Sequence, residues 1–182
     1  MEQRKRRRVA LVAAVVVVAA VLAGLYVFGE LGGTGSVEVM VHDAPCSGCA
    51  HVYVTFSSVS VHEADIHGSG WTTLNVSGST IDLEALNGTA MAKVLGLDQL
   101  SAGQYTQVRL AVTHVAVVFT NGSNVTAMLT SANSADVNVA FTVHPGMTTV
   151  LDIDVNLATS VHVTGGVVMF TPNIGSVVVS GS

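Results

Sequence analysis

The sequence has 182 residues, enough for one medium-sized domain preceded by an anchoring segment. Hydrophobic residues make up 49% of it and charged residues only 10%, against about 25% charged residues in an average soluble domain. Five of the seven basic residues lie within residues 1–8, so the chain from Thr34 onward carries ten acidic and two basic residues, a net charge of −8. This balance argues against a nucleic-acid partner, because phosphate binding requires clustered cations.

Residues 9–29 form an apolar run without a charged or strongly polar side chain. As a helix this run would be roughly 31 Å long, close to the ~30 Å thickness of a bilayer core. The basic cluster before it predicts a single-pass anchor with its N-terminus in the cytoplasm and the rest of the chain outside the cell membrane. A cleaved secretory signal is the alternative, and it would place the domain in the same compartment.

The expected organisation has four parts. A cytoplasmic basic tail (1–8) precedes the transmembrane signal anchor (9–29), a glycine-rich flexible linker (30–36) and an extracellular domain (37–180).

Within the domain, apolar and polar residues alternate with a period of two, which is typical of strands with one buried face. The alternation slips by one residue at Ser57-Ser58 and again at Thr113-His114, and such slips indicate β-bulges. The pattern predicts strands over residues 37–42, 52–62, 71–76, 108–119, 125–129, 137–143, 148–157, 160–163 and 167–179.

Residues 82–105 break the alternation. Apolar residues recur there at spacings of three and four, at Leu83, Leu86, Ala90 and Val94, which predicts a short helical crossover between strands. The fold class that follows is all-β. We expect an antiparallel β-sandwich of about eight or nine strands with an immunoglobulin-like or transthyretin-like Greek-key topology and this one helical crossover.

Four N-x-[ST] sequons fall at predicted turns or strand edges, where a glycan can project into solvent. If the host glycosylates its surface proteins, the candidate N-glycosylation sites are Asn75, Asn87, Asn121 and Asn124.

Several motifs together resemble a known family. They are "HDAPCSGCAHVYVTFSSVSVH", then Trp71, "IDLEALNGTAMAKVLGLDQLSAGQYTQVRL", "FTVHPGMTTVLDIDV" and "FTPNIGSVVV". Over about residues 37–177 the chain is similar to the domain of unknown function 4382 family, which occurs in archaeal and bacterial secreted or membrane-anchored proteins. The resemblance implies a β-sandwich on the cell surface without established chemistry, and it supplies no catalytic residues. The two cysteines depart from the family pattern.

The segment "HDAPCSGCAH" is the strongest candidate site. If its flanking strands pair as a hairpin, His42 and His51 become cross-strand neighbours below a loop that carries Cys46 and Cys49. Two thiolates and two imidazoles could bind copper or zinc in a tetrahedral set. The external compartment favours instead a disulfide between the two cysteines. A redox dithiol fits least, because reactive C-x-x-C pairs normally lie at a helix N-terminus.

The other polar clusters have simpler structural explanations. The cluster "HEADIH" (62–67) does not match the H-E-x-x-H zinc motif, and a solvated turn is favoured over weak metal binding. Asp152, Asp154 and Asn156 share one face of a predicted strand, but alternate residues lie ~7 Å apart, too far for one calcium ion without other ligands. There is no nucleophile elbow or phosphate-binding glycine loop, so we expect no enzyme and no catalytic residues.

The sequence therefore predicts a membrane-anchored, cell-surface domain that acts as a non-catalytic binding or structural module of the envelope. Its expected partners are the membrane, through residues 9–29, and an envelope protein or glycan, with no cofactor. Two alternatives stay open. One is an extracellular copper- or zinc-binding protein that uses the His42/Cys46/Cys49/His51 set. The other is a filament or adhesion subunit, in which the apolar "SVVVS" strand complements the sheet edge of a neighbour.

Overall fold

The computed structural model of the chain describes residues 33–64, 70–76, 80–86, 92–130 and 133–181. The predicted anchor (9–29) lies outside these ranges. Within them, no helix combines the length and the apolar character needed to cross a membrane.

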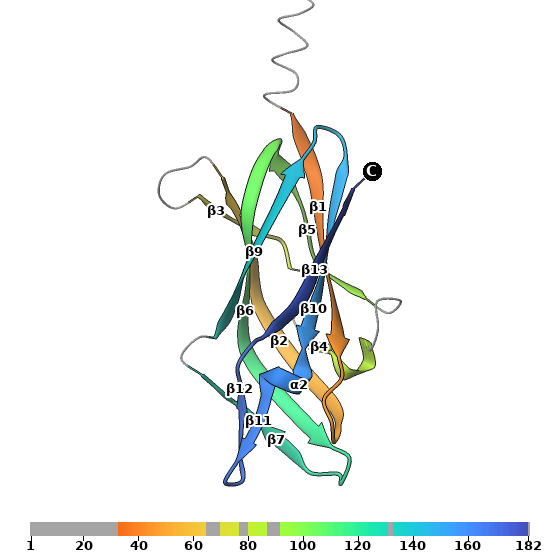
Figure 1. Cartoon of the computed structure of the whole chain (residues 1–182), viewed down its shortest axis with the longest axis vertical. Coiled ribbons are helices and arrows are strands. Elements are labelled where there is room, and N and C mark those ends of the chain that lie inside the picture. The colour runs from red at the N-terminus through yellow and green to blue at the C-terminus, as the bar shows by residue number, and fades with distance from the viewer. Residues whose placement is uncertain (1–32, 65–69, 77–79, 87–91, 131–132, 182) are drawn as a thin grey trace, which may run out of the picture.

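The described residues are nearly all in strands (Figure 1). The strands are β1 (Thr34–Ala44), β2 (Cys49–Glu63), β3 (Trp71–Leu74), β4 (Thr80–Asp82), β5 (Lys93–Ser101), β6 (Gly103–Phe119), β7 (Asn124–Thr126), β8 (Met128–Leu129), β9 (Ser134–Val143), β10 (Thr148–Asn156), β11 (Val161–Thr164), β12 (Val167–Phe170) and β13 (Ile174–Gly181). Two helical turns complete the set, the 3-10 turn η1 (Glu84–Leu86) and the four-residue helix α2 (Leu157–Ser160).

The first sheet, sheet A, has the strand order β13-β10-β1-β5. Of its central strands, β10 alternates strictly between buried and half-exposed residues, and β1 alternates as far as Val41. In β10 the buried positions are Thr149, Leu151, Ile153 and Val155, and in β1 they begin at Val37, Val39 and Val41. Because side chains on a strand alternate between its two faces, sheet A presents one apolar face to the core and one polar face to solvent.

The second sheet, sheet B, is built on the long antiparallel pair of β2 and β6. β3 and β4 flank β2, and β7 and β9 flank β6. The register of the central pair shifts beside Ser57 and again where Thr113 is inserted, so both predicted bulges are confirmed. A small third sheet, sheet C, has the order β11-β12-β8.

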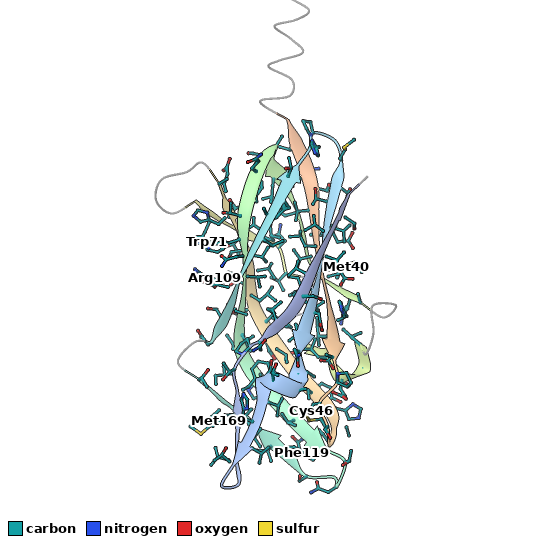
Figure 2. All side chains as sticks on the ribbon, viewed as in Figure 1. Met40, Cys46, Trp71, Arg109, Phe119 and Met169 are labelled. Carbon is teal, nitrogen blue, oxygen red and sulfur yellow. A yellow bond between two sulfur atoms is a disulfide. The ribbon has the colours of Figure 1, made fainter. Side chains whose placement is uncertain are left out.

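The inward faces of sheets A and B pack into one valine- and leucine-rich core (Figure 2). Fully buried side chains come from both sheets, for example Val39 and Leu151 from sheet A and Val52 and Val115 from sheet B. Burying such side chains stabilises each by roughly 1.5–3 kcal/mol relative to exposure, so the two-layer packing is the main source of stability.

The prediction of purely antiparallel pairing is wrong. β1 pairs with β10 in parallel, from Ser36↔Thr148 to Ala44↔Asn156, and β8 pairs with β12 in parallel. Short turns impose antiparallel pairing only on consecutive strands. β1 and β10 lie about a hundred residues apart in sequence, so no turn fixes their relative direction.

The strand count and two boundaries also differ from the prediction. Thirteen strands are described, partly because the expected strand 125–129 divides into β7 and β8 and the expected strand 167–179 into β12 and β13. Within the expected helical crossover only η1 is helical, and residues 93–101 form β5, whose buried side chains include Leu95 and Leu100. The periodicity of three and four in this stretch was misleading.

Thr34–Ser36, expected in the linker, instead open β1. The amide of Ser36 donates to the carbonyl of Met147 at 2.8 Å. At Gly35 an added Cβ would lie 2.3 Å from the carbonyl oxygen of His144. The close approach of these two backbones therefore requires glycine at this position.

Candidate functional site

The connection between β1 and β2 carries the candidate site, and it is not a hairpin. β1 belongs to sheet A and β2 to sheet B, so residues 45–48 cross from one sheet to the other. The expectation that His42 and His51 become cross-strand neighbours is therefore wrong. It assumed that consecutive strands pair, and these two strands lie in opposite layers.

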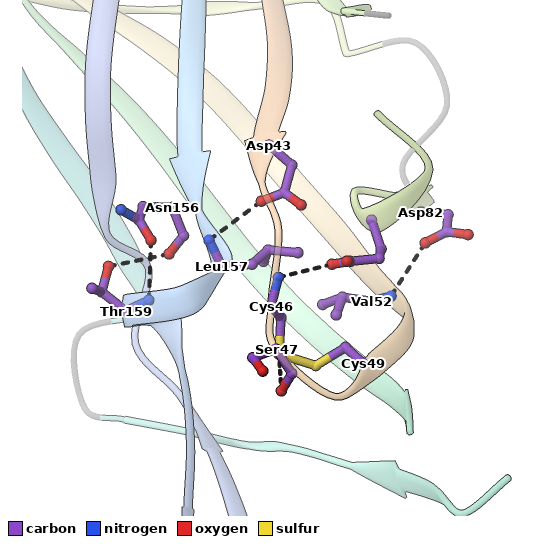
Figure 3. Close-up of a disulfide and its surroundings, with 10 residues drawn as sticks. Asp43, Cys46, Ser47, Cys49, Val52, Asp82, Asn156, Leu157 and Thr159 are labelled. Carbon is purple, nitrogen blue, oxygen red and sulfur yellow. Dashed lines mark hydrogen bonds between the residues drawn. A yellow bond between two sulfur atoms is a disulfide. The ribbon is translucent and has the colours of Figure 1, made fainter. Parts of the chain in front are cut away.

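Cys46 and Cys49 close this crossing as a disulfide, with their sulfur atoms 2.04 Å apart (Figure 3). The amide of Cys49 donates to the carbonyl of Cys46 at 3.3 Å, and the amide of Thr120 donates to the carbonyl of Gly48 at 3.0 Å. Gly48 has a φ of +88°, a left-handed conformation that strongly favours glycine. The loop is thus tied both to itself and to the end of β6.

His42 and His51 face different carboxylates. Nδ1 of His42 lies 2.8 Å from Oδ1 of Asp152, on the outer face of sheet A, and the residue is 6% exposed. Nδ1 of His51 lies 2.7 Å from Oδ2 of Asp82, whose other oxygen accepts the amide of Val52 at 3.2 Å.

The structure consequently brings together two of the four predicted metal ligands, as a disulfide, and leaves the histidines apart. Among the described residues, no group of three or more histidine, cysteine, aspartate or glutamate side chains is arranged to hold a metal ion.

A buried carboxyl group, Asp43, lies beneath the loop and is only 3% exposed. It continues the core-facing row Val37, Val39 and Val41. Its Oδ1 accepts the amide of Leu157 at 3.3 Å, whereas no described residue hydrogen-bonds to its Oδ2. This hydrogen bond joins two residues that lie 114 positions apart in the sequence.

Burial is the main reason why the pKa of Asp43 rises from 3.8 to about 7. The negative charges of Glu84 and Asp154 raise it further, against the opposing effect of the Leu157 amide. Glu84 also joins the site to the loop, because its Oε2 accepts the amide of Cys46 at 3.1 Å (Figure 3). Chemically, this arrangement holds a proton and fixes backbone groups from β1, the disulfide loop and α2.

The second polar cluster forms part of the outer face of sheet B. His62 packs edge-on against Trp71, with ring centroids 5.1 Å apart, and Arg109 lies 4.1 Å above the Trp71 ring (Figure 2). Arg109 donates two hydrogen bonds of 2.7 Å to Asp136, and this hydrogen bonding lowers the pKa of Asp136. His67, from the same predicted cluster as His62, lies outside the described residues.

The remaining candidates have separate structural roles. Asp152 and Asp154 lie beside His42, and Asn156 caps α2 by accepting the amide of Thr159 at 3.1 Å. Of the sequon asparagines, Asn87 is outside the described residues. The other three are exposed on the surface, at Asn75, Asn121 and Asn124.

The end of the molecule opposite the start of β1 (Figure 1) is built from segments without a charged residue, and the half-buried carboxylate of Glu84 borders it at the amide of Cys46. It is formed by residues 45–50, 119–129 and 161–170, which contain no Asp, Glu, Lys or Arg and which we call the distal end. Cys49 pairs with Phe119, and Met169 with Met128, so these segments adjoin. Apolar side chains are exposed here, at 64% for Met128, 57% for Val163 and 43% for Val167.

Comparison with known proteins identifies the family but no activity. A solved structure of a "putative cell adhesion protein" from Bacteroides eggerthii DSM 20697 aligns with a TM-score of 0.34 and 12% identity, over 82% of this chain and 54% of that one. This chain thus spans about half the length of that protein. No curated protein matches the sequence. The family model "Domain of unknown function (DUF4382)" matches residues 34–172, and the chain therefore belongs to this family.

Proposed function

We propose that this protein is a membrane-anchored, non-catalytic binding module of the cell exterior, and that it contacts its partner through the distal end. In this arrangement the apolar run 9–29 spans the membrane, with residues 1–8 inside the cell. β1 then leads away from the membrane and carries the disulfide loop to the far end of the domain.

The uncharged distal end is the observation that supports this proposal. The chain from Thr34 onward has a net charge of −8, yet none of its acidic residues lies in the three distal segments. Exposed apolar side chains that cluster without charge are typical of the central part of a binding surface. The same surface exposes hydroxyl and amide groups, including those of Thr120, Asn121 and Ser123.

Such a surface suits an uncharged partner, either an envelope protein or a glycan. The disulfide and the bond from Thr120 to Gly48 hold this surface in one conformation. Pre-organisation reduces the entropy that binding would otherwise cost.

The test measures adhesion of phospholipid vesicles carrying the full chain to intact cells of the producing organism. Val163→Glu and Met128→Glu place a charge on the distal end, and we expect each to reduce the bound vesicles by at least about tenfold, since desolvating an unpaired charge costs more than 1.4 kcal/mol. Leu97→Glu is the matched control, because Leu97 is 53% exposed on β5 in sheet A. An equal loss of bound vesicles in all three variants, or a loss in none of them, would contradict the proposal.

A further inference from the structure

The C-terminal strand β13 is an edge strand without protection against pairing. Among the described residues it pairs only with β10, so its other side presents free backbone groups. It contains no charged residue and no proline, and Val178 and Val179 are 55% and 40% exposed. Long apolar edges of this kind are templates for another strand, and proteins usually block them.

Other edge strands of the two main sheets are short or carry a charged residue. β5, at the opposite edge of sheet A, carries Lys93 and Asp98, and the amide of Leu97 donates to Asn75 at 3.3 Å. β9 carries Asp136, which binds Arg109, and β3 has only four residues. Among the described edge strands of sheets A and B, β13 alone combines eight residues with the absence of a charged residue.

Open space accompanies this edge. A hollow of about 530 Å³ lies between residues 134–139 of β9 and residues 172–177, which lead into β13. A second hollow of about 410 Å³ includes Thr142, His144 and residues 179–181. The two hollows therefore adjoin β13 on either side of Val178.

The sequence of β13 is also self-complementary. Ser176-Val177-Val178-Val179-Ser180 is the same in both directions and is flanked by Gly175 and Gly181. The register with β10 is regular from Ser176 onward, and the irregularity falls at Gly175. Two copies aligned antiparallel about Val178 would place Val178 opposite Val178, and Val177 opposite Val179 of the second copy. Valine pairs of this kind stabilise neighbouring strands.

We propose that β13 of one molecule pairs antiparallel with β13 of a second copy, about a two-fold axis at Val178, and joins two copies of sheet A into one continuous sheet. The axis is perpendicular to the sheet, because an antiparallel pair of identical strands has no other two-fold symmetry that preserves its hydrogen bonds. Val178 lies level with Asp152 and Met40, near the middle of β1.

This two-fold reverses the long axis of the second molecule, so the two β1 strands begin at opposite ends of the dimer. If each chain is anchored through its N-terminal segment, as proposed above, the two anchors lie in different membranes. The pairing would then link molecules on facing surfaces. This consequence depends on the proposed anchoring, whereas the strand pairing itself does not.

The contact area indicates a weak dimer. A regular five-residue strand extends over roughly 17 Å, and such a contact buries much less than the ~1,200 Å² of a stable complex. Each copy also carries the net charge of −8, so repulsion weakens association at low ionic strength and salt relieves it. Many copies on two membranes would compensate through avidity.

The pairing is tested with the full chain in detergent micelles and a short bis-maleimide cross-linker. Val178→Cys should give a cross-linked dimer, because the two-fold places the two introduced thiols next to each other. Leu97→Cys is the control, since Leu97 is similarly exposed at 53% but lies on β5, at the opposite edge of sheet A. Equal dimer yields from the two variants would overturn the proposal.

The arrangement between membranes is tested with phosphatidylcholine vesicles that carry the full chain in 150 mM salt. Val178→Lys vesicles and Val178→Glu vesicles should each cluster about tenfold less than wild type, because like charges meet at the axis. A mixture of the two should cluster again, and Leu97→Lys vesicles should behave as wild type, because Leu97 lies on β5 at the opposite edge of sheet A. Cross-linking of Val178→Cys without clustering of wild-type vesicles would overturn the facing-membrane arrangement and leave the strand pairing supported. Clustering that Val178→Lys does not reduce would overturn the role of β13.

Discussion

Asp43 is the residue whose environment departs most from that of an ordinary surface carboxylate. It lies on the core-facing side of β1, 3% exposed, with one oxygen on the amide of Leu157. Placing a charge in such a position is costly, so the folded protein favours the protonated form below a pKa of about 7. The proton also relieves repulsion from Glu84, which lies beside Asp43 and holds the loop.

The raised pKa predicts how stability depends on pH. Between pH 4 and 7 the folded state binds this proton more tightly than the unfolded state, whose pKa is near 3.8. The contribution of Asp43 to the free energy of unfolding is therefore largest at low pH, and it decreases as pH rises towards 7. Asp43→Asn removes this titration but keeps an oxygen that can accept from Leu157.

Thermal unfolding of the full chain, followed by circular dichroism at pH 4.5 and pH 8, measures the effect. Relative to wild type, Asp43→Asn should gain stability between these pH values by up to about 3 kcal/mol, because about 2.5 pKa units separate pH 4.5 from the raised pKa. Glu38→Gln is the control, because Glu38 is a half-exposed carboxyl on the same strand. Parallel pH profiles for wild type and Asp43→Asn would show that the carboxyl is not protonated in the fold.

The position of Asp43 could have been found from the sequence. Counting by two from Val37 through Val39 and Val41 places Asp43 on the buried face. What the sequence could not supply is its partner, because Leu157 and Glu84 reach it from elements remote in the chain. The same applies to the contacts of His42 with Asp152 and of His51 with Asp82, which depend on which strands become neighbours.

At the scale of an element, the crossing between β1 and β2 determines what the disulfide can do. A hairpin loop would leave the two flanking strands hydrogen-bonded to each other, whereas this crossing joins strands that belong to different sheets. The disulfide closes a very short loop, with a sequence separation of 3. Loop-closure entropy for such a small loop is modest, about 2 kcal/mol.

Replacing both cysteines, Cys46→Ser with Cys49→Ser, should therefore lower the free energy of unfolding by about 2 kcal/mol without unfolding the domain. Most of the core of sheets A and B consists of side chains outside the loop, although Cys49 belongs to it. Chemical denaturation in detergent, with and without reductant, measures this difference. Reductant should destabilise the wild type by a similar amount and leave the double variant unchanged. A double variant that is as stable as oxidised wild type would contradict this role.

Which segments form strands was largely predictable from the sequence, because the alternation of apolar and polar residues is a local property of each segment. Both bulges were located by the slip in that alternation, at Ser57-Ser58 and Thr113-His114. The direction of pairing was not predictable, since β1 and β10 are joined by no short turn. β5 was missed because its residues also fit a helical spacing and because Gly96 interrupts the alternation.

At the scale of the whole molecule, the two ends of the domain differ in their content of charged residues and in the elements that form them. β1 begins at one end of the domain, and the disulfide loop and the turns at Gly122 and Gly165-Gly166 lie at the other (Figure 1). The acidic residues lie outside the distal end. An anchor preceding β1 would direct this uncharged end away from the membrane, and the free edge of β13 would lie along the side of the domain.

The central claim is that the domain lies outside the cell, with its distal end accessible. Thr164→Cys places a thiol at the exposed distal end, and Gln3→Cys places one in the basic tail. Intact cells of the producing organism that express each full-length variant are treated with a membrane-impermeant maleimide. We predict that Thr164→Cys is labelled in intact cells and that Gln3→Cys is labelled only after permeabilisation. Labelling of Thr164→Cys only after permeabilisation would contradict the proposed location and function.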